Sequence, residues 1–503
     1  MAERNVHMTP VTAIRIASED NVATLLADAA AGDSVAVDGG RIVAPNAIPR
    51  GHKIATAAVA QGDAVTKYGF PIGRALVAIE AGDHVHSHNL ATALTADTPL
   101  VPAHQPDDSG FARGPDRYFR GYRRADGRVG TRNEIWIIPT VGCVGNLAER
   151  VARIAATKHA GSVDGIHAFK HPFGCSQLGD DLSHTRALLA GLAQHPNAGG
   201  VLIVGLGCEN NQLGALIESI PAAGRTHIRS LAAQSVEDDE AVCLSLIDEL
   251  VGIAGQAERS EAPLSELVLG VKCGGSDGMS GLTANPLVGR MGDSIAGSGG
   301  RVILTEIPEI FGAEPMLLGR AVSRDIFDRA AALIDDFKAY FVRHGEPVSE
   351  NPSPGNVAGG ITTLEEKSLG AVQKGGKVPL TDVQRYGGQA TRPGLTLLEA
   401  PGNDAISSTA LTAAGATLIL FTTGRGTPLG FPAPTLKIAS NTALADRKSG
   451  WIDFDAGRVL DDGFDGTADA LLDLVIDTAS GRPTRSETNG ERDIAIWKSG
   501  VTL

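Results

Sequence analysis

Three cysteines each follow directly on an apolar run of the kind that forms a buried strand. Cys143 ends IWIIPTVGC, Cys208 ends VLIVGLGC and Cys273 ends LVLGVKC, while His171 and Cys175 lie in HPFGC after a fourth apolar run. In open α/β sheets, ligands bind just outside the carboxyl ends of the strands. Thiolates and imidazoles are ligands of transition metals. A scattered cysteine is more often a core residue, but four beside glycines at strand ends favour a metal site.

Histidines form a second group that could bind a metal. His84, His86 and His88 alternate in HVHSHN, and alternation along a strand would place the three side chains on one face. Such a face could hold a metal or an anionic ligand; the alternative is a solvated edge strand. His52, next to a lysine in RGHK, could join them and suits a carboxylate substrate. Neither a CxxC nor an HExxH motif is present.

Glycine-rich segments supply further polar groups. They lack the GxGxxG and GxxxxGK[ST] patterns of nucleotide sites, and each instead couples flexible backbone to a hydroxyl, amide or carboxylate. A polyhydroxy acid needs many such directional contacts. Arg425, between two glycines, is the best single candidate for pairing with a carboxylate. The segments are CGGSDGMSG (273–281), NPSPGN (351–356), PGND (401–404) and TTGRGT (422–427).

The apolar pattern predicts the elements that must position these residues. Residues 10–95 contain short strands separated by Gly-Asp turns, which predicts a small all-β module. From residue 123 onward, buried-type strands alternate with helical patterns, which predicts parallel sheets. A second such series follows a polar break at 256–263 and includes a long helix over 325–344. The predicted division is a β-rich module with a linker at 94–114 (1–110), a second α/β domain (111–260) and a C-terminal α/β domain (261–503).

Composition excludes several classes of protein. The 503 residues agree with about three domains at about 150 residues each. A net charge of −14, with no basic cluster, argues against nucleic-acid binding. No uncharged apolar run approaches the roughly 20 residues of a membrane span, and charges interrupt residues 1–30, unlike a signal peptide. The odd number of cysteines argues against a disulfide framework, and Cys243 is expected to be structural on an apolar helix face. We expect a cytoplasmic protein without nucleic-acid or membrane partners.

Ten ordered segments resemble the altronate/galactarate dehydratase family, and the likeness spans nearly the whole chain. GHKIA and HVHSHN resemble the small β-rich SAF domain (a β-clip module) of that family, and HPFGCSQLGDD with GLGCENNQ resembles its altronate branch. The segments are GRVGTRNEIWIIPTVGCV (127–144), HPFGCSQLGDD (171–181), HPNAGGVLIVGLGCENNQ (195–212), CGGSDGMSGLTANP (273–286), LTEIPEIFGAE (304–314), ENPSPGN (350–356), GGITTLEEKSLG (359–370), APGNDA (400–405), FTTGRGTP (421–428) and WIDFDAG (451–457).

The resemblance implies a hydro-lyase of hexuronate catabolism. In that reaction D-altronate loses water and gives 2-dehydro-3-deoxy-D-gluconate, with dependence on iron(II) that manganese(II) can replace. Removing the proton at C2, next to a carboxylate, requires stabilisation of an enediolate, which a divalent ion supplies as a Lewis acid. A base takes the C2 proton and an acid protonates the departing C3 hydroxyl.

We assign roles to the candidate residues on this basis. The metal would be held by His171, Cys175, Cys208 and Cys273, with His84, His86 or His88 closing over it from the SAF domain. Acid–base catalysis is assigned to Glu209, Asp277 or His52. The carboxylate and hydroxyls of the substrate would contact Arg425, Asn285, Lys367 and Ser276.

Four alternatives remain open at this point. An iron–sulfur cluster is less favoured than a single ion, because the cysteines lack a cluster-type spacing. The substrate could instead be galactarate or a sulfolactate, as in other branches of the family. A protein of a different class, a non-catalytic sugar-acid binder, would use the SAF domain for recognition. By analogy, the chain could form a homo-oligomer.

Overall fold

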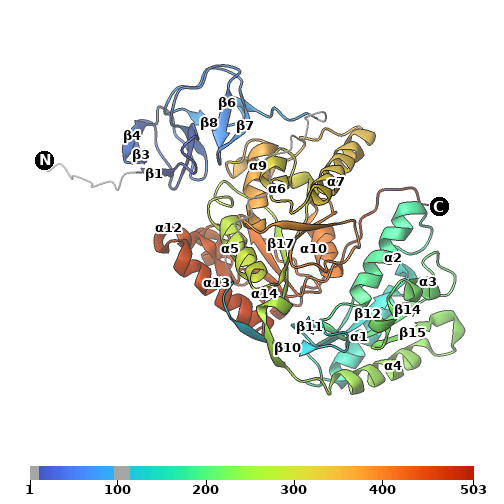
Figure 1. Ribbon diagram of the computed structural model, residues 1–503. Helices are drawn as coiled ribbons and strands as arrows, with labels where there is room; N and C mark the ends of the chain where they lie inside the picture. Colours follow the sequence, from blue (N-terminus) through green and yellow to red (C-terminus); the bar gives the residue numbers. More distant parts are fainter. Residues whose placement is uncertain (1–10, 96–113, 503) are drawn as a thin grey trace.

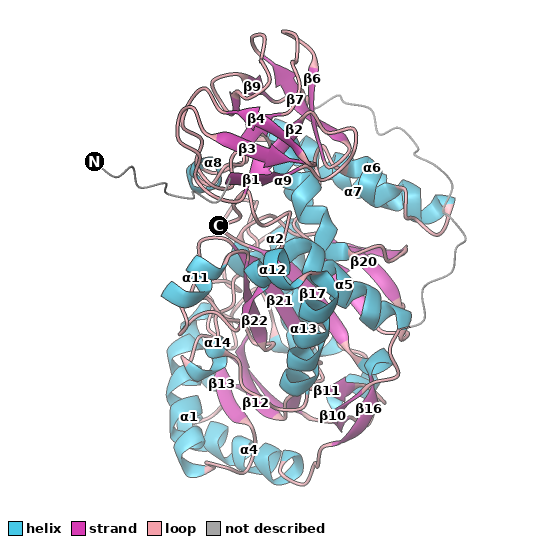
Figure 2. Cartoon of the chain, turned by 90° about the vertical axis from the view of Figure 1, so that its left-hand side faces the viewer, coloured by secondary structure: helices cyan, strands magenta, loops and turns pink. Residues whose placement is uncertain are grey.

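The computed structural model describes residues 11–95 and 114–502. A β module (residues 11–95) lies at one end of the molecule, an α/β domain at the other, and a larger α/β domain between them (Figures 1 and 2). The expected order of a β-rich module followed by two α/β domains with mainly parallel sheets is therefore confirmed. Most of the predicted linker, and the first ten residues considered above for a signal peptide, lie outside the described residues.

The β module contains two small sheets, in the orders β4-β3-β1-β2-β5-β8 and β6-β7-β9. Aspartates close its turns as expected: Asp33 accepts a hydrogen bond from the backbone of Ala30, and Asp83 from that of Glu80. The apolar run at 75–79 (ALVAI), which its residue types predict as a strand, belongs to a strand only at Ala75, where β7 ends. The strands are β1 (Val11–Ile14), β2 (Val22–Leu25), β3 (Ser34–Val37), β4 (Gly40–Val43), β5 (Lys53–Ala55), β6 (Ala64–Lys67), β7 (Phe70–Ala75), β8 (His84–Val85) and β9 (Leu90–Ala91).

The second domain is a parallel sheet in the order β13-β12-β14-β15. All six residues of β12 are buried, which is why residues 135–139 are apolar throughout rather than alternating; the buried Glu134 at its start pairs with Arg492. Its strands are β12 (Glu134–Pro139), β13 (Gly165–Ala168), β14 (Ala198–Gly205) and β15 (Ile228–Ala232), and its helices are α1 (Gly145–Lys158), α2 (Gly179–Ala193), α3 (Leu213–Glu218) and α4 (Asp239–Ala254).

The C-terminal domain has a seven-stranded parallel sheet, β19-β20-β18-β17-β21-β22-β23. From β17 the chain first builds β18, β19 and β20 on one side and then returns for β21 to β23 on the other. The carboxyl end of β17 is therefore the topological switch point, where open α/β sheets bind ligands. The strands are β17 (Val268–Cys273), β18 (Arg301–Leu304), β19 (Leu380–Gln384), β20 (Gly394–Leu398), β21 (Leu418–Thr423), β22 (Thr435–Ala439) and β23 (Phe454–Asp455).

Helices cover this sheet, and the predicted long helix is present as α7. Ser323 caps α7 by accepting a hydrogen bond from the Ile326 amide, and apolar residues at helical spacing bury one face. The helices are α5 (Ala284–Gly297), α6 (Glu314–Leu318), α7 (Arg324–Arg343), α8 (Pro354–Ala358), α9 (Leu364–Ala371), α10 (Asp404–Ala413), α11 (Thr442–Arg447), α12 (Val459–Asp462), α13 (Phe464–Ala479) and α14 (Arg485–Thr488). Within the described ranges, no helix combines the length and apolarity that crossing a membrane requires.

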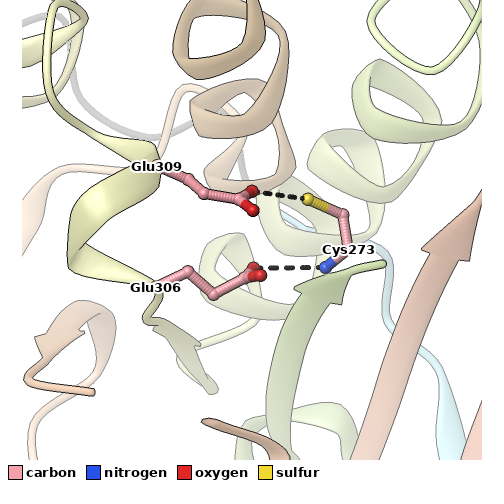
Figure 3. A group of neighbouring side chains, drawn as sticks. All are labelled: Cys273, Glu306 and Glu309. Carbon is pink, nitrogen blue, oxygen red and sulfur yellow. Dashed lines mark hydrogen bonds between the residues drawn. The ribbon is translucent and has the colours of Figure 1, made fainter. Parts of the chain in front are cut away.

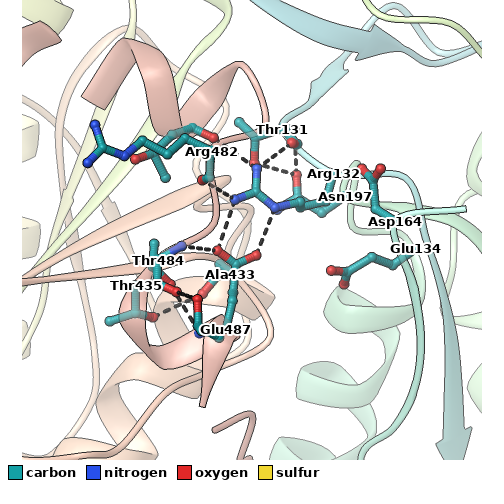
Figure 4. Close-up of polar contacts among 12 residues, drawn as sticks. Thr131, Arg132, Glu134, Asp164, Asn197, Ala433, Thr435, Arg482, Thr484 and Glu487 are labelled. Atoms are coloured by element: carbon teal, nitrogen blue, oxygen red, sulfur yellow. Dashed lines mark hydrogen bonds and ion pairs between the residues drawn. The ribbon is translucent and has the colours of Figure 1, made fainter. Parts of the chain in front are cut away.

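Strand pairing and a buried ion pair are among the contacts that join the second and C-terminal domains. The polar break expected at 256–263 includes strand β16 (Ser260–Pro263), which pairs with β10 (Tyr118–Arg123) beside β11 (Val129–Gly130). Arg132, just before β12, donates to both carboxylate oxygens of Glu487 in α14, at 2.8 and 2.9 Å (Figure 4). Because both side chains are buried, this bidentate ion pair fixes how the two domains meet.

Candidate active site

Acidic and thiol groups meet at the carboxyl end of β17. Cys273 ends that strand, and its Sγ lies 3.1 Å from Oε2 of Glu309, while its backbone amide donates to Glu306 at 3.2 Å (Figure 3). Glu306 and Glu309 come directly after β18, the neighbouring strand. The three side chains are buried, and their potential ligand atoms lie within 4.8 Å of one another, so this group could hold a metal ion.

Three lysines already contact this group. Lys272 pairs with Glu306, and the Nζ of Lys374 lies 2.9 Å from Glu306 and 2.7 Å from the sulfur of Cys273. Lys367 contacts Glu309 at 2.9 Å. Burial and the two carboxylates raise the pKa of the Cys273 thiol to about 12. Because the ammonium groups balance the carboxylate charges, an added divalent ion would have to displace them.

The same lysines determine the ionisation of Glu309. Burial alone would raise the pKa of this carboxyl, but the ammonium groups of Lys367, Lys374 and Lys272 outweigh burial and lower the pKa to about 2. The pKa of Lys367 is raised, because its attraction to Glu309 exceeds the cost of burial. At neutral pH the ionised carboxylate of Glu309 therefore lies among protonated lysines, which suits binding of an anion and donation of a proton.

The four residues predicted to bind substrate are divided by the structure. Lys367 lies at the group just described and also donates to Asn351 at 3.0 Å. Arg425 is exposed after β21 and donates to the carbonyl of Gly355 at 3.0 Å. Ser276 is buried, with its carbonyl bound by the Asn356 side chain.

Asn285 is placed differently from the other three. It is buried, donates to the carbonyl of Gly370 and accepts from Thr422, so both ends of its amide bind protein. This structure therefore gives Asn285 an internal role rather than a free donor.

Asp277, predicted to be an acid or base, is held by many donors. Its Oδ1 accepts from the Ser280 amide and hydroxyl and from Ser440, and its Oδ2 accepts from Asn441. These bonds join the turn after β17 to the segment after β22. A carboxylate with this many partners positions loops at the switch point.

Four histidines gather on the face of the β module that meets the C-terminal domain. The Nδ1 of His52 lies 3.0 Å from the Nε2 of His84, and the rings of His52 and His86 have centroids 4.9 Å apart. His88 extends the group, with its ring centroid 5.4 Å from that of His84. The four rings are called the histidine cluster below. His52, His84 and His86 form its tightest triangle, with centroids 4.9 to 5.5 Å apart.

The expected strand over His84–His88 is wrong beyond Val85, although the histidines do assemble. The Asn89 side chain accepts from the His86 amide and donates to the His84 carbonyl, which closes a turn. Asn89 thus replaces the strand with a turn that still brings the rings together.

Two imidazoles of the cluster are held in the neutral form. Burial and neighbouring imidazoles lower the pKa of His84 to about 3, while burial and the Lys53 ammonium lower that of His86 to about 4. Neutral imidazoles offer the lone pairs that such metals bind. His52 hydrogen bonds to the Ala358 backbone, and the Nδ1 of His86 lies 2.8 Å from Thr362. Outer partners of this kind orient histidine ligands in metal sites.

A buried ion-pair network holds the β module against α9. Lys53 of β5 and Lys67 of β6 both lie 2.8 Å from Glu366 of α9, and their side chains are at most 2% exposed. Lys53 also donates to Gly360 and Thr362. These contacts place the histidine cluster beside residues 358–362, a few residues before Lys367.

The other predicted metal ligands lie elsewhere. His171, Cys175 and Cys208 follow strands of the second domain, so the structure does not bring them to Cys273. Both ring nitrogens of His171 are engaged, with the Pro139 carbonyl at 2.8 Å and the Phe173 amide at 3.2 Å. Glu209, predicted to be catalytic, also belongs to that domain and accepts from Leu206, Gly207 and Thr140.

Sequence reasoning missed Glu306, Glu309 and Lys374. The glutamates follow an apolar strand in LTEIPE, which was a usable signal, since strand-end carboxylates resemble the strand-end cysteines. Lys374 lies in a turn after α9, and nothing in its spacing indicates burial.

Comparisons with known proteins agree over the whole fold. Three family models match: the altronate/galactarate dehydratase SAF domain over residues 11–93, the D-galactarate dehydratase/altronate hydrolase second domain over 121–255, and the D-galactarate/altronate dehydratase C-terminal domain over 264–502. The altronate dehydratases of Bacillus subtilis and Escherichia coli are each 46% identical over 494 residues, covering 97% of this chain and 99% of theirs. Galactarate dehydratase (L-threo-forming) of Escherichia coli is 31% identical over 463 residues, covering 86% of each.

The three family models follow one another in the order of the β module and the two α/β domains, and the full-length relatives share that extent. This chain belongs to the altronate/galactarate dehydratase family.

Proposed function

We propose that this protein is a hydro-lyase that converts D-altronate to 2-dehydro-3-deoxy-D-gluconate. The identity of 46% to altronate dehydratases, against 31% to a galactarate dehydratase, supports altronate as the substrate. The structural observation that carries the proposal is the position of the histidine cluster beside the segment that leads to Lys367 and Glu309. Metal-binding imidazoles thus lie close to protonated lysines, the two components that such a dehydration needs.

We assign the metal to His52, His84 and His86, the tightest triangle of the histidine cluster. This assignment moves His52 from acid–base catalysis to metal binding and leaves out Cys273, whose thiol is already bound by Lys374 and Glu309. Iron(II), with manganese(II) as substitute, suits imidazole ligands. The bound ion would supply Lewis-acid stabilisation of charge on the substrate carboxylate and on the enediolate.

The remaining residues bind and orient the sugar acid. Arg425 is exposed at the end of β21 and offers a guanidinium to the carboxylate. Asn351 lines a cavity of about 820 Å³ together with Pro308 and Ala358, and Ala358 hydrogen bonds to His52. Asn351 also accepts from Lys367, so the cavity adjoins the group around Glu309. The volume is ample for a six-carbon acid.

Lys367 is assigned to proton donation at the C3 hydroxyl. Its raised pKa keeps Nζ protonated at neutral pH, and Glu309 and Asn351 fix the direction of the ammonium group. Protonation of the departing hydroxyl lets it leave as water. The proton lost from C2 passes to solvent, and the neutral amine of Lys367 regains a proton from solvent before the next turnover, which the adjacent Glu309 carboxylate favours.

The experiment is anaerobic turnover of D-altronate and of galactarate, with and without iron(II), with 2-keto acid formation as the readout. We expect activity on altronate that a chelator removes and iron(II) restores. His84→Ala should abolish both iron(II) binding, measured by calorimetry, and turnover. His344→Ala, an exposed histidine after α7, is the matched control.

Other outcomes would revise the proposal. Activity on galactarate alone would keep the family and change the substrate. Binding of altronate without turnover, with iron(II) present, would indicate a sugar-acid binding protein. Full iron(II) affinity in His84→Ala would refute the metal assignment while leaving the substrate assignment intact.

A further inference from the structure

A cavity separate from the proposed active site lies where the β module meets helices of the C-terminal domain. Its volume is about 1040 Å³, and its walls come from the β module, α5, α6, α13 and the turn at 372–377 that follows α9. The residues assigned above to the metal and to the sugar acid are not among those that line it. Its apolar lining consists of Ile16, Tyr68, Pro286, Met316, Val372 and Ala468.

Arg320 lines this cavity, and its guanidinium group is only partly satisfied. The Nη1 atom donates to the carbonyls of Gly375 and Gly376. The Nε and Nη2 atoms are buried and have no hydrogen-bond partner among the described residues. Because a buried donor without an acceptor is costly, such an atom in a native protein indicates that a water or a ligand completes the site.

The two unpaired nitrogens determine which ligand fits. Nε–H and Nη2–H lie on one edge of the planar guanidinium and point the same way, which matches the two oxygens of a carboxylate. Burial lowers the pKa of Arg320 to about 10, an effect that Asp293 opposes, so the group is still charged at neutral pH. The nearby Asp293 carboxyl disfavours a doubly charged anion such as phosphate. A monocarboxylate is therefore the best match.

The cavity also has room for the body of such a ligand. Its volume is at the upper end of the range for small-molecule sites, and its apolar lining suits a ligand with an apolar body. Nε and Nη2 are covered in the empty cavity, so a lining side chain has to move when a ligand binds. Met316 is half-buried, and its unbranched thioether chain adapts readily to a new neighbour.

The turn at 372–377 connects this cavity to the group around Glu309. Gln373 lines the cavity. The next residue, Lys374, reaches the sulfur of Cys273 at 2.7 Å. The carbonyl of Gly375 then accepts from Arg320 at 3.1 Å. The position of the guanidinium group therefore influences the turn that carries the Lys374 ammonium group.

We propose that Arg320 anchors a second ligand site, which binds a monocarboxylate with an apolar body through its Nε and Nη2 edge. The bound carboxylate fixes the guanidinium group and thereby stabilises the turn at 372–377. Binding at this site does not depend on which reaction the protein catalyses. An effect of the ligand on turnover would act through Lys374 and rests on the proposed function.

The test is calorimetric titration of the full chain with 4-bromobenzoate, with 4-bromobenzamide as a neutral control of the same shape. We expect saturable binding of the acid, roughly tenfold or more tighter than that of the amide. Arg320→Lys keeps the positive charge but lacks the guanidinium edge, so it should weaken binding of the acid roughly tenfold or more. Arg290→Lys should leave it unchanged, because Arg290 lines the same cavity but already pairs with Asp465. Thermal unfolding confirms that both variants are folded.

Two further measurements do not require a variant. Anomalous scattering from crystals that contain 4-bromobenzoate should place the bromine in this cavity and the carboxylate on Arg320. Hydrogen exchange at 372–377 should slow when 4-bromobenzoate is added and stay unchanged with 4-bromobenzamide.

Several results would overturn the proposal. They are the absence of saturable binding, a carboxylate that binds elsewhere on the chain, and tighter binding of inorganic phosphate than of 4-bromobenzoate. Equal affinity of Arg320→Lys and the wild-type chain would overturn it as well. Unchanged hydrogen exchange at 372–377 in the occupied protein would refute the effect on the turn. A failed altronate assay would leave all of these results unaffected.

Discussion

The ion-pair network between the β module and α9 allows a quantitative prediction. Glu366→Gln removes the one carboxylate that Lys53 and Lys67 share, at 2.8 Å from each. Removal of one partner from a buried ion pair typically costs about 3–5 kcal/mol, because the other charge stays buried and uncompensated. Lys53 keeps two oxygen acceptors, Gly360 and Thr362, whereas Lys67 keeps contact with the neighbouring Tyr68 ring at 5.0 Å.

We therefore expect docking of the β module to weaken by about 3–5 kcal/mol, roughly 10²–10⁴-fold in the docking equilibrium. Hydrogen exchange across β5 and α9 measures this loss, because local opening exposes those amides. Exchange in the second domain should remain unchanged. Iron(II) binding should weaken as well, since the histidine cluster is supported by residues 358–362.

Two further variants control this experiment. Glu80→Gln changes an exposed carboxylate of the same module and should leave exchange unaltered. Replacing Lys53, Lys67 and Glu366 together by methionine should recover most of the stability, because an apolar triad of similar volume carries no desolvation cost. A change below about 1 kcal/mol in Glu366→Gln would mean that the network contributes no more than a surface pair, and the reasoning would fail.

Four further outcomes can be measured. Burial raises the pKa of Glu366, but the two lysines outweigh it and lower the pKa to about 2, below the unfolded value of about 4.3. The stabilisation is thus fully present above roughly pH 5 and lost as pH falls toward 2, so amides in α9, relative to their intrinsic exchange rate at each pH, should be less protected at pH 3 than at pH 5; equal protection would contradict this. Asp277→Asn should cost about 1.5–3 kcal/mol in urea unfolding, because a charged acceptor of several bonds is lost. Arg425→Lys should raise KM for altronate roughly tenfold with Tm unchanged, since the bidentate donor is lost; an unchanged KM would exclude carboxylate binding there. Lys367→Met should lower kcat by roughly 10²-fold or more, as expected for a lost proton donor, while calorimetry still detects altronate; an unaltered kcat would remove Lys367 from catalysis.

The expectation that ligands bind just beyond the carboxyl ends of parallel strands identified the correct sheet edges. It could not show which of the two sheets each strand belongs to. Cys273 and Cys208 both follow apolar strands, and in sequence they are equivalent. Their strands belong to different sheets, so one predicted ligand set became two separate groups. The spacing of apolar residues in the sequence indicates whether a strand is buried and where it runs. The sheet to which the strand belongs depends on contacts between residues that are far apart in the sequence.

The proposed catalytic group illustrates a second limit. Glu309 and Lys367 are 58 residues apart in the numbering of the chain, yet their charged atoms lie 2.9 Å apart. Each looks like a surface charge in isolation, because burial of a charge depends on a partner that local sequence does not specify. The histidines were found because they are close in sequence, and His52 joined them because it lies one residue before β5.

The pairing of Arg132 with Glu487 has a consequence for the order in which the protein matures. The two residues are 355 positions apart, and a chain made at about 5–20 residues per second needs roughly 20–70 s to span that distance. Once β15 has been made, the second domain has its sheet complete, but the guanidinium of Arg132 still lacks the carboxylate of Glu487. Asp181 precedes Ser499 by 318 positions, so its contacts with the amides of Ser499 and Gly500 also form late. The second domain therefore receives its last contacts from the final part of the chain to be synthesised.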